Sequence, residues 1–80
     1  MRIISQKSLP YYIDIPYDRV WVEAKNNNVY AYDGIQTTNL GVYSSQENAI
    51  KAIKKLHTKV EQLGSITDYR IFVFPEDNEL

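Results

Sequence analysis

The chain has 80 residues, 44% of them hydrophobic and 24% charged, and its formal net charge is −1. This composition is typical of one soluble globular domain, covering residues 1–80. A charge so close to zero argues against non-specific nucleic-acid binding, and the absence of cysteine excludes disulfides, zinc–thiolate sites and thiol catalysis. No signal-peptide segment follows MRIISQ, and no apolar run approaches the roughly 18 residues of a membrane span, so we expect a cytoplasmic protein.

Short strands are predicted near both ends of the chain. Together with one strand before the helix, they cover residues 2–5, 12–16, 39–43 and 69–74. Pro16 has no N–H to give to a ladder, so the second of them should end there or lie at a sheet edge. The acidic residues 75–80 (PEDNEL) are expected to form a frayed tail.

Residues 20–33 (VWVEAKNNNVYAYD) alternate in polarity on both sides of three asparagines, a pattern typical of a β-hairpin. A two-residue turn at Asn26–Asn27 or Asn27–Asn28 gives the hairpin one aliphatic face, and asparagine tolerates the positive φ of such turns. That face holds Val20, Val22, Ala24, Val29 and Ala31. The opposite face holds Trp21, Glu23, Lys25, Tyr30 and Tyr32. A three-residue turn would mix the two sets.

One helix is predicted over about residues 45–63. Ser44 and Glu47 have the spacing of a capping box, and Gly64 supplies a left-handed stop. Its apolar residues recur at intervals of three and four, which places them in one stripe. They are Ala49, Ile53, Leu56, Val60 and Leu63, joined by Ile50 and Ala52.

These elements predict an α+β fold, an antiparallel sheet of four to five strands with the helix packed on one face. A single helix covers one face, so the aromatic face of the hairpin should be left open. Trp21, Tyr30, Tyr32 and Lys25 are the main candidate binding residues, and Tyr43 and Arg70 could extend the same surface, with Phe72 and Phe74 beside Arg70. Exposed aromatic rings suit self-association, a partner protein or a ligand with a flat ring, and they also stabilise sheets without any partner.

Other polar clusters carry weaker signals. Four lysines lie on the outer side of the helix, where a solvated face is the simplest interpretation and an anionic partner the alternative. They are Lys51, Lys54, Lys55 and Lys59. The single histidine, His57, forms neither a zinc motif nor a triad. The carboxylates Asp14, Asp18 and Asp33 match no metal loop, and Asp33-Gly34 is typical of a turn. We therefore expect neither an enzyme nor a cofactor or metal site.

Four segments resemble a group of small uncharacterised proteins found in phages and prophages of Firmicutes. They are MRIISQ at the start, DIPYD (14–18), LGVYSSQENAIKAI (40–53) and FVFPEDNEL (72–80). The resemblance covers nearly the whole chain, brings no function or site residue with it, and implies a phage context. The segment LGVYSSQENA is also similar to the strand-to-helix step of the three-strand DNA-binding modules of phage integrases, but the arginine-rich strands of those modules are missing.

In that context the aromatic face suggests a non-enzymatic binding protein. The first expectation is sequestration of a nucleotide-derived immune signal, with rings for the base and Lys25 and Arg70 for phosphate, in a protein that acts as a homodimer or higher homo-oligomer. The alternative is inhibition of a host defence protein through the same face. An accessory DNA-binding protein comes third because of the net charge.

Overall fold

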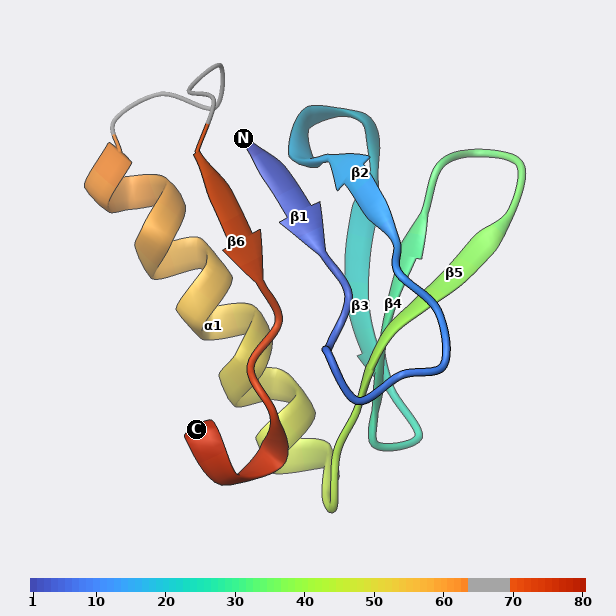
Figure 1. The fold of residues 1–80 in the computed structure, drawn as a ribbon, viewed down its shortest axis with the longest axis vertical. Coiled ribbons are helices and arrows are strands. Elements are labelled where there is room, and N and C mark those ends of the chain that lie inside the picture. Colours follow the sequence, from blue (N-terminus) through green and yellow to red (C-terminus); the bar gives the residue numbers. More distant parts are fainter. Residues whose placement is uncertain (64–69) are drawn as a thin grey trace.

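The computed structural model describes residues 1–63 and 70–80, and the described residues form one helix and six strands (Figure 1). The strands are β1 (Arg2–Ile4), β2 (Asp14–Pro16), β3 (Trp21–Lys25), β4 (Asn28–Tyr32), β5 (Thr37–Val42) and β6 (Ile71–Val73), and the helix is α1 (Gln46–Leu63). Short 3-10 helices cover Tyr17–Arg19 and Asp77–Glu79. The expected helix stop at Gly64 and the expected first residue of the last strand, Tyr69, lie outside the described residues.

The α+β class is confirmed, but the prediction of one antiparallel sheet of four to five strands is wrong. The strands form two sheets of three, β2-β1-β6 (sheet A) and β3-β4-β5 (sheet B). Sheet B is antiparallel throughout, whereas β1 and β6 pair in parallel in sheet A. A parallel pair needs a long crossover, and β1 and β6 lie at opposite ends of the chain, so nothing local in the sequence sets their direction.

The hairpin β3–β4 has the register and the faces that the alternation predicts. Its two-residue turn is Asn26–Asn27, with φ of 52° and 66°, the left-handed conformation of a type I′ turn. Val29 and Ala31 are buried, and the aliphatic side chains of the first arm pack against the same core. Trp21, which pairs with Tyr32, is 68% exposed.

The Asn26–Asn27 turn gives a stability prediction. Asn27→Ala should lower the free energy of unfolding by about 1 kcal/mol, because a Cβ without a local hydrogen-bonding group makes the left-handed conformation costly. Asn27→Gly should leave it unchanged or raise it, since Asn-Gly is the preferred type I′ pair. Urea unfolding of both variants measures this. If alanine and glycine are tolerated equally, the turn does not have the positive φ described.

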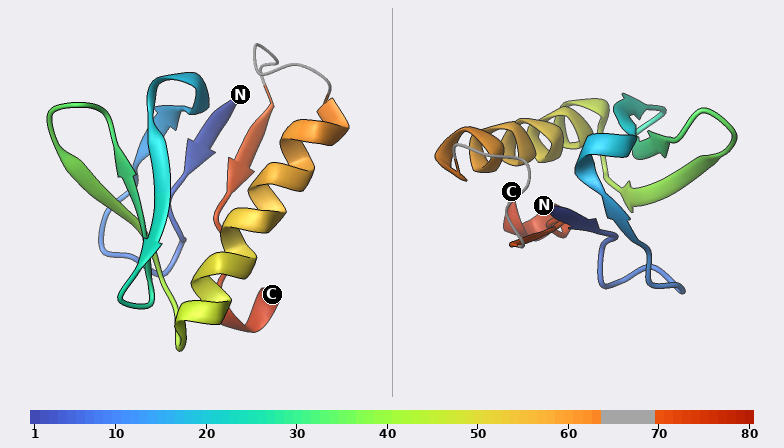
Figure 2. Two further views of the ribbon diagram at one scale, coloured as in Figure 1. Left: turned by 180° about the vertical axis from the view of Figure 1, so that it is seen from behind. Right: turned by 90° about the horizontal axis from the view of Figure 1, so that it is seen from above.

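The core lies between α1, sheet A and sheet B, which Figure 2 shows as three sides of one interior. Each side contributes fully or nearly fully buried side chains. Sheet A gives Ile3, sheet B gives Val29, Ala31 and Leu40, α1 gives Ala49, Ala52 and Leu56, and Met1, Tyr43 and Phe74 complete the set. Of the predicted stripe of α1, Ala49, Ala52 and Leu56 are buried, and Ile53 and Val60 are partly buried against the core. Ile50 is 40% exposed, and the side chain of Leu63 lies outside the described ones.

Gln6 joins the two sheets and is only 2% exposed. A bulge leaves Leu40 without a ladder partner, and its carbonyl oxygen accepts a hydrogen bond from the Gln6 backbone N–H at 2.8 Å. The Gln6 side chain accepts from the Val42 N–H at 2.7 Å and donates to the carbonyl oxygens of Val42 and Pro75 at 3.2 and 3.0 Å. Gln6 therefore connects the chain beyond β1 to β5 by individual hydrogen bonds rather than through a ladder.

The C-terminal residues 75–80 are not a frayed tail. Asp77–Glu79 form a 3-10 helix with a capping box between Glu76 and Glu79, and Leu80 packs against the core. Asp77 accepts hydrogen bonds from the Ser44 N–H at 3.3 Å and the Asn48 side-chain amide at 3.0 Å. The acidic composition suggested a solvated tail, but these carboxylates complete a helix start and a turn.

The start of α1 also differs from the prediction. Ser45 is the capping residue, because its hydroxyl oxygen accepts a hydrogen bond from the Asn48 N–H at 3.1 Å. The sequence predicts Ser44 as the capping residue, in a box with Glu47, which is one residue before the capping residue in the structure. Ser44 instead contacts the side chain of Asn48, and Asp77 places a negative charge at the positive end of the helix dipole.

The interactions of the Asp77 carboxylate should make the stability of the fold depend on pH. Interactions with the Ser44 side chain, the Asn48 side chain and the Ser44 N–H lower its pKa below the ordinary 3.8. A carboxyl with a lowered folded-state pKa stabilises the fold above its unfolded pKa and loses that effect as the pH falls through the folded value. Wild-type stability should therefore fall below about pH 3.8 more steeply than that of Asp77→Asn, as measured by thermal melts between pH 5 and 2. Parallel curves for the two proteins would contradict the contact.

Candidate functional site

The outer face of sheet B carries the predicted aromatic residues. Trp21 and Tyr32 sit opposite each other in the β3–β4 ladder, and their rings stack with centroids 5.9 Å apart at an angle of 29°. The Tyr32 hydroxyl donates to the Gly34 carbonyl oxygen at 3.1 Å, and Tyr30 accepts from the Asn28 amide at 3.3 Å. Sheet B therefore holds these rings in place while much of the Trp21–Tyr32 pair stays exposed.

The predicted binding residues of this aromatic face do not all line the hollow found beside them. A hollow of about 240 Å³ borders Trp21, but Tyr30, Tyr32 and Lys25 do not line it. Lys25 shares the face, four residues and therefore roughly 13 Å along β3 from Trp21. The structure brings Trp21, Tyr30 and Tyr32 together, with Lys25 at the far end of the same strand.

Tyr43 does not extend this aromatic face. It is 5% exposed in the core, its hydroxyl donates to the Pro75 carbonyl oxygen at 2.7 Å, and burial raises its pKa far above the usual value of 10.0. Tyr43 also packs over Gly41, where an added Cβ would lie 2.8 Å from its ring. It is a core residue that ties sheet B to the C-terminal segment.

Arg70 does not lie on this face either. It directly precedes β6, and its carbonyl oxygen accepts the Arg2 N–H, so it belongs to sheet A rather than sheet B. Phe74, expected beside it, is 1% exposed in the core. Alternation along a strand assigns side chains to faces, but it does not say which sheet the strand joins.

The three carboxylates considered from the sequence do not form a metal site. Asp14 forms an ion pair with Arg2 at 2.7 Å. Asp33 accepts hydrogen bonds from the N–H groups of Ile35 and Gln36, both at 2.8 Å, and the Gln36 and Ile35 bonds lower its pKa. Residues 33–36 therefore form the expected turn, with Gly34 at φ 100°. Within residues 1–63 and 70–80, no group of three or more histidine and acidic side chains could hold a metal ion.

A second surface is shallow, open to solvent and strongly basic. The lysines on the outer side of α1, together with Phe72 of β6, line a hollow of about 440 Å³, which we call the lysine groove. Its lysines are Lys51, Lys54, Lys55 and Lys59. The rings of Phe72 and Phe74 form a T-shaped pair, with centroids 5.2 Å apart and an interplanar angle of 89°. The sequence indicates the row of lysines on the helix. It does not indicate that Phe72, from the distant strand β6, lines the same hollow.

The charges in the lysine groove are not neutralised from within the described part of the chain. None of the four lysines forms an ion pair there, and no carboxylate is among the described lining residues. Lys51, Lys55 and Lys59 follow one another at intervals of one helical turn, so their attachment points span roughly 12 Å. The groove can therefore hold an elongated anion that carries more than one negative group.

Comparison of the chain with protein-family models, curated proteins and solved structures found no match. Over the residues that the structure describes, no helix combines the length and apolar character needed to cross a membrane.

Proposed function

We propose that this protein is a non-enzymatic binding protein that sequesters a nucleotide-derived small molecule in the lysine groove. The observation that carries the proposal is the combination, in one hollow, of an aromatic side chain and four lysines that pair with no carboxylate of the described residues. The phage context that the sequence resemblance implies makes a host immune signal the natural ligand, so that binding would blunt a defence.

Each part of the lysine groove corresponds to a part of such a ligand. Ammonium groups attract phosphates as point charges and adapt to their positions, while Phe72 offers an apolar contact for a base or sugar. A volume of about 440 Å³ lies in the range of small-molecule sites. The sequence predicts the nucleotide on the aromatic face of sheet B, but Arg70 is not there to supply phosphate contacts.

The lysine groove is proposed to bind the nucleotide without converting it to a product. The one hydroxyl among the described lining residues, that of Thr58, already donates to the Lys54 carbonyl oxygen at 3.0 Å. Lysines spread along a solvated helix supply charge, and nothing beside them in the described lining positions an acid–base pair.

Native mass spectrometry tests the proposal directly. After incubation with cyclic and ADP-ribose-derived nucleotides, the wild-type protein should carry a noncovalent adduct with the mass of one intact nucleotide. The adduct should weaken in Lys51→Gln/Lys55→Gln and persist in Trp21→Ala. The absence of any adduct, or equal adducts in the wild type and the lysine variant, would rule the lysine groove out as the site.

A protein partner on the aromatic face is the second candidate function. Trp21 is 68% exposed and stacked on Tyr32, the kind of rigid anchor that dominates protein interfaces. The edges of sheet B are partly occupied, because Gln46 bonds the Ala24 carbonyl oxygen on β3 and Gln6 bonds Val42 on β5. A partner would therefore meet the face rather than extend the sheet.

Light scattering and affinity capture separate the two kinds of protein partner. A second copy would give a concentration-dependent dimer that Trp21→Ala dissociates. A host protein would be retained by the wild type and lost with Trp21→Ala, while Lys51→Gln/Lys55→Gln would keep it. A monomer at every concentration that captures nothing specific would leave the aromatic pair as sheet stabilisation.

A further inference from the structure

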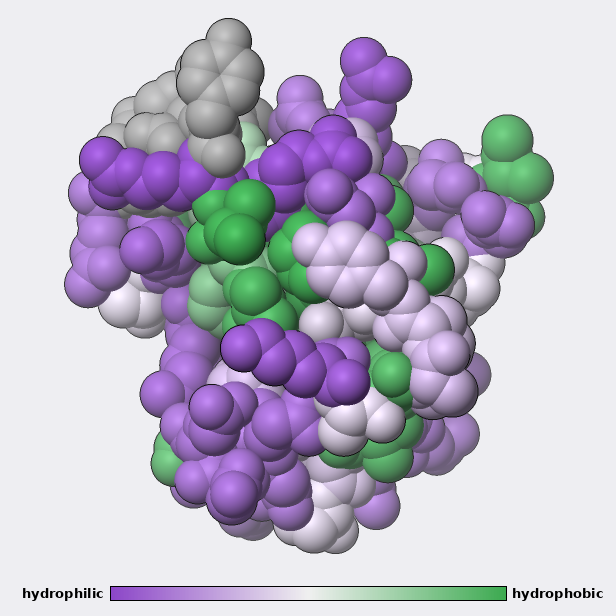
Figure 3. Space-filling view, in the orientation of Figure 1, coloured by the Kyte–Doolittle hydropathy of each residue, from purple (hydrophilic) through white to green (hydrophobic). Residues whose placement is uncertain are grey.

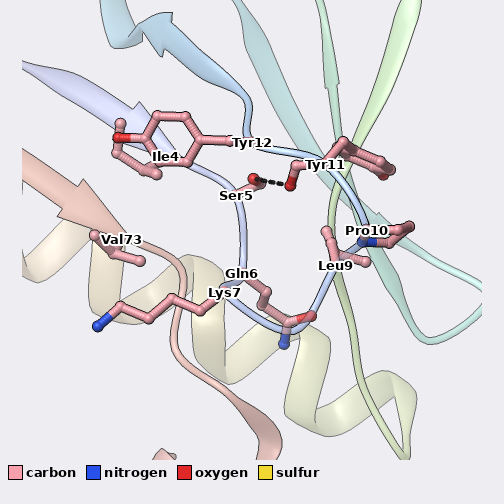
Figure 4. A pocket seen from close by; sticks show the side chains of 9 residues that line it. All are labelled: Ile4, Ser5, Gln6, Lys7, Leu9, Pro10, Tyr11, Tyr12 and Val73. Carbon is pink, nitrogen blue, oxygen red and sulfur yellow. Dashed lines mark hydrogen bonds between the residues drawn. The ribbon is translucent and has the colours of Figure 1, made fainter.

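The segment between β1 and β2 forms a hollow that belongs neither to the lysine groove nor to the aromatic face. Its volume is about 520 Å³, and it lies on the outer side of sheet A. Figure 4 shows Tyr12 and Ile4 on one side of this hollow and the Lys7 side chain on the other, with Val73 of β6 between them. Figure 3 shows the same side of the molecule, where apolar side chains come to the surface over β1 and β6.

Hydrogen bonds hold the wall of this hollow in place. The Ser5 hydroxyl accepts from the Ile13 N–H at 3.0 Å and donates to the Tyr11 carbonyl oxygen at 3.5 Å, which closes the loop at its base. The Tyr11 hydroxyl donates to the Asn39 carbonyl oxygen at 2.8 Å, and the Leu9 N–H donates to Gln6 at 3.2 Å. The loop is therefore fixed both to itself and to sheet B, and the hollow exists before any ligand arrives.

The groups left for a ligand are an apolar floor, one cation and the rings of Tyr11 and Tyr12, of which Tyr12 is the more exposed. Tyr12 is 72% exposed, while Ile4 and Val73 line the hollow between it and Lys7. The Ser5 and Gln6 side chains are already engaged within the protein. We propose that this pocket binds a small aromatic acid, with its ring against Tyr12 and the floor and its carboxylate beside Lys7.

The surroundings of Lys7 disfavour a ligand that carries several negative charges. Glu76 and Glu79 line the neighbouring hollow, which Lys7 also borders, so an anion with several charges would meet repulsion there. The lysine groove, with four lysines, instead favours a ligand that carries several negative charges. Phe72 faces that groove and Val73 faces this pocket, since successive side chains of a strand point to opposite sides. The two sites share β6 and differ in ligand, so this inference does not depend on the proposed function.

The test uses indole-3-acetate as the probe and uncharged indole as its matched control, followed by methyl NMR at millimolar ligand. Indole-3-acetate should shift the Ile4 and Val73 methyl signals of the wild-type protein, and indole should bind more weakly. Removing the ring contact in Tyr12→Leu should weaken binding roughly 2- to 10-fold. Lys7→Gln should weaken indole-3-acetate binding roughly 2- to 5-fold and leave indole unchanged.

Lys25→Gln is the control variant, because it removes an exposed lysine elsewhere and should bind as the wild type does. The wild-type shift map requires no substitution, so it stands even if a variant fails to fold. The inference is overturned if neither methyl moves, if the largest shifts lie on α1 or around Trp21, or if Tyr12→Leu and Lys7→Gln both bind like the wild type.

Discussion

Replacing Gln6 with leucine should lower the free energy of unfolding by about 3 kcal/mol, the largest stability change we expect from one substitution. Leucine fills a similar space but leaves the Val42 N–H and the carbonyl oxygens of Val42 and Pro75 without their partner. Each buried polar group left unsatisfied costs about 1–3 kcal/mol. Since Gln6 is 2% exposed, water cannot readily replace the amide.

For a domain of this size the change corresponds to a melting temperature roughly 12–24 °C below that of the wild type. Thermal melts followed by circular dichroism measure it. Gln36→Leu is the matched control, because Gln36 is exposed and makes its described hydrogen bonds through the backbone. The control should stay within about 0.5 kcal/mol of the wild type. If both leucine variants melt together, Gln6 does not join the two sheets.

Neutralising three lysines of the lysine groove should weaken the binding of tripolyphosphate roughly 3- to 150-fold. The variant is Lys51→Gln/Lys55→Gln/Lys59→Gln. Each exposed charge pair contributes about 0.2–1 kcal/mol, and three such contacts to one ligand account for this range. Glutamine keeps the helix propensity of lysine, so α1 should fold as before. Isothermal titration at low salt measures the loss.

A charge-matched control separates the lysine groove from overall charge. Lys7→Gln/Arg19→Gln/Lys25→Gln removes three positive charges outside the groove, one of them on the aromatic face. It should bind tripolyphosphate nearly as the wild type does, and wild-type binding should weaken as salt is added. Equal losses in the two triple variants would show that net charge, not the groove, attracts the anion.

The hairpin could be predicted because its information is local. Alternating polarity and three asparagines fix the turn at Asn26–Asn27, and with it the face on which Trp21 lies. The same is true of the α1 stripe, in which Ala49 and Leu56 recur with the period of a helix. In both elements the residues that decide the structure lie within a few positions of one another.

The division into two sheets depends on contacts that the sequence does not display. Strands β1, β2 and β6 have three residues each, too few for a pattern that selects a partner. Gln6, which bonds both β5 and Pro75, reads in the sequence as a surface residue. The burial of Tyr43 follows from the position of Pro75, 32 residues away. The order of residues 75–80 likewise depends on distant contacts, since the partners of Asp77 lie at the start of α1.

The candidate site was predictable in part. The four lysines and their spacing were visible in the sequence, but Phe72 lies on β6, and its placement beside α1 depends on the pairing of β6 with β1. The pocket between β1 and β2 that Tyr12 lines was not predicted, because a loop between two short strands has no periodicity to show which side chains stay exposed.

Recovery of an intact nucleotide after binding tests the central claim most directly. The wild-type protein is incubated with cyclic and ADP-ribose-derived nucleotides, desalted and heated, and the supernatant is analysed by liquid chromatography with mass detection. We predict that at least one nucleotide stays with the protein through desalting and is released with unchanged mass, and that the triple lysine variant retains far less. Loss of every nucleotide on desalting, or release of a cleaved product, would contradict a protein that sequesters its ligand without turnover.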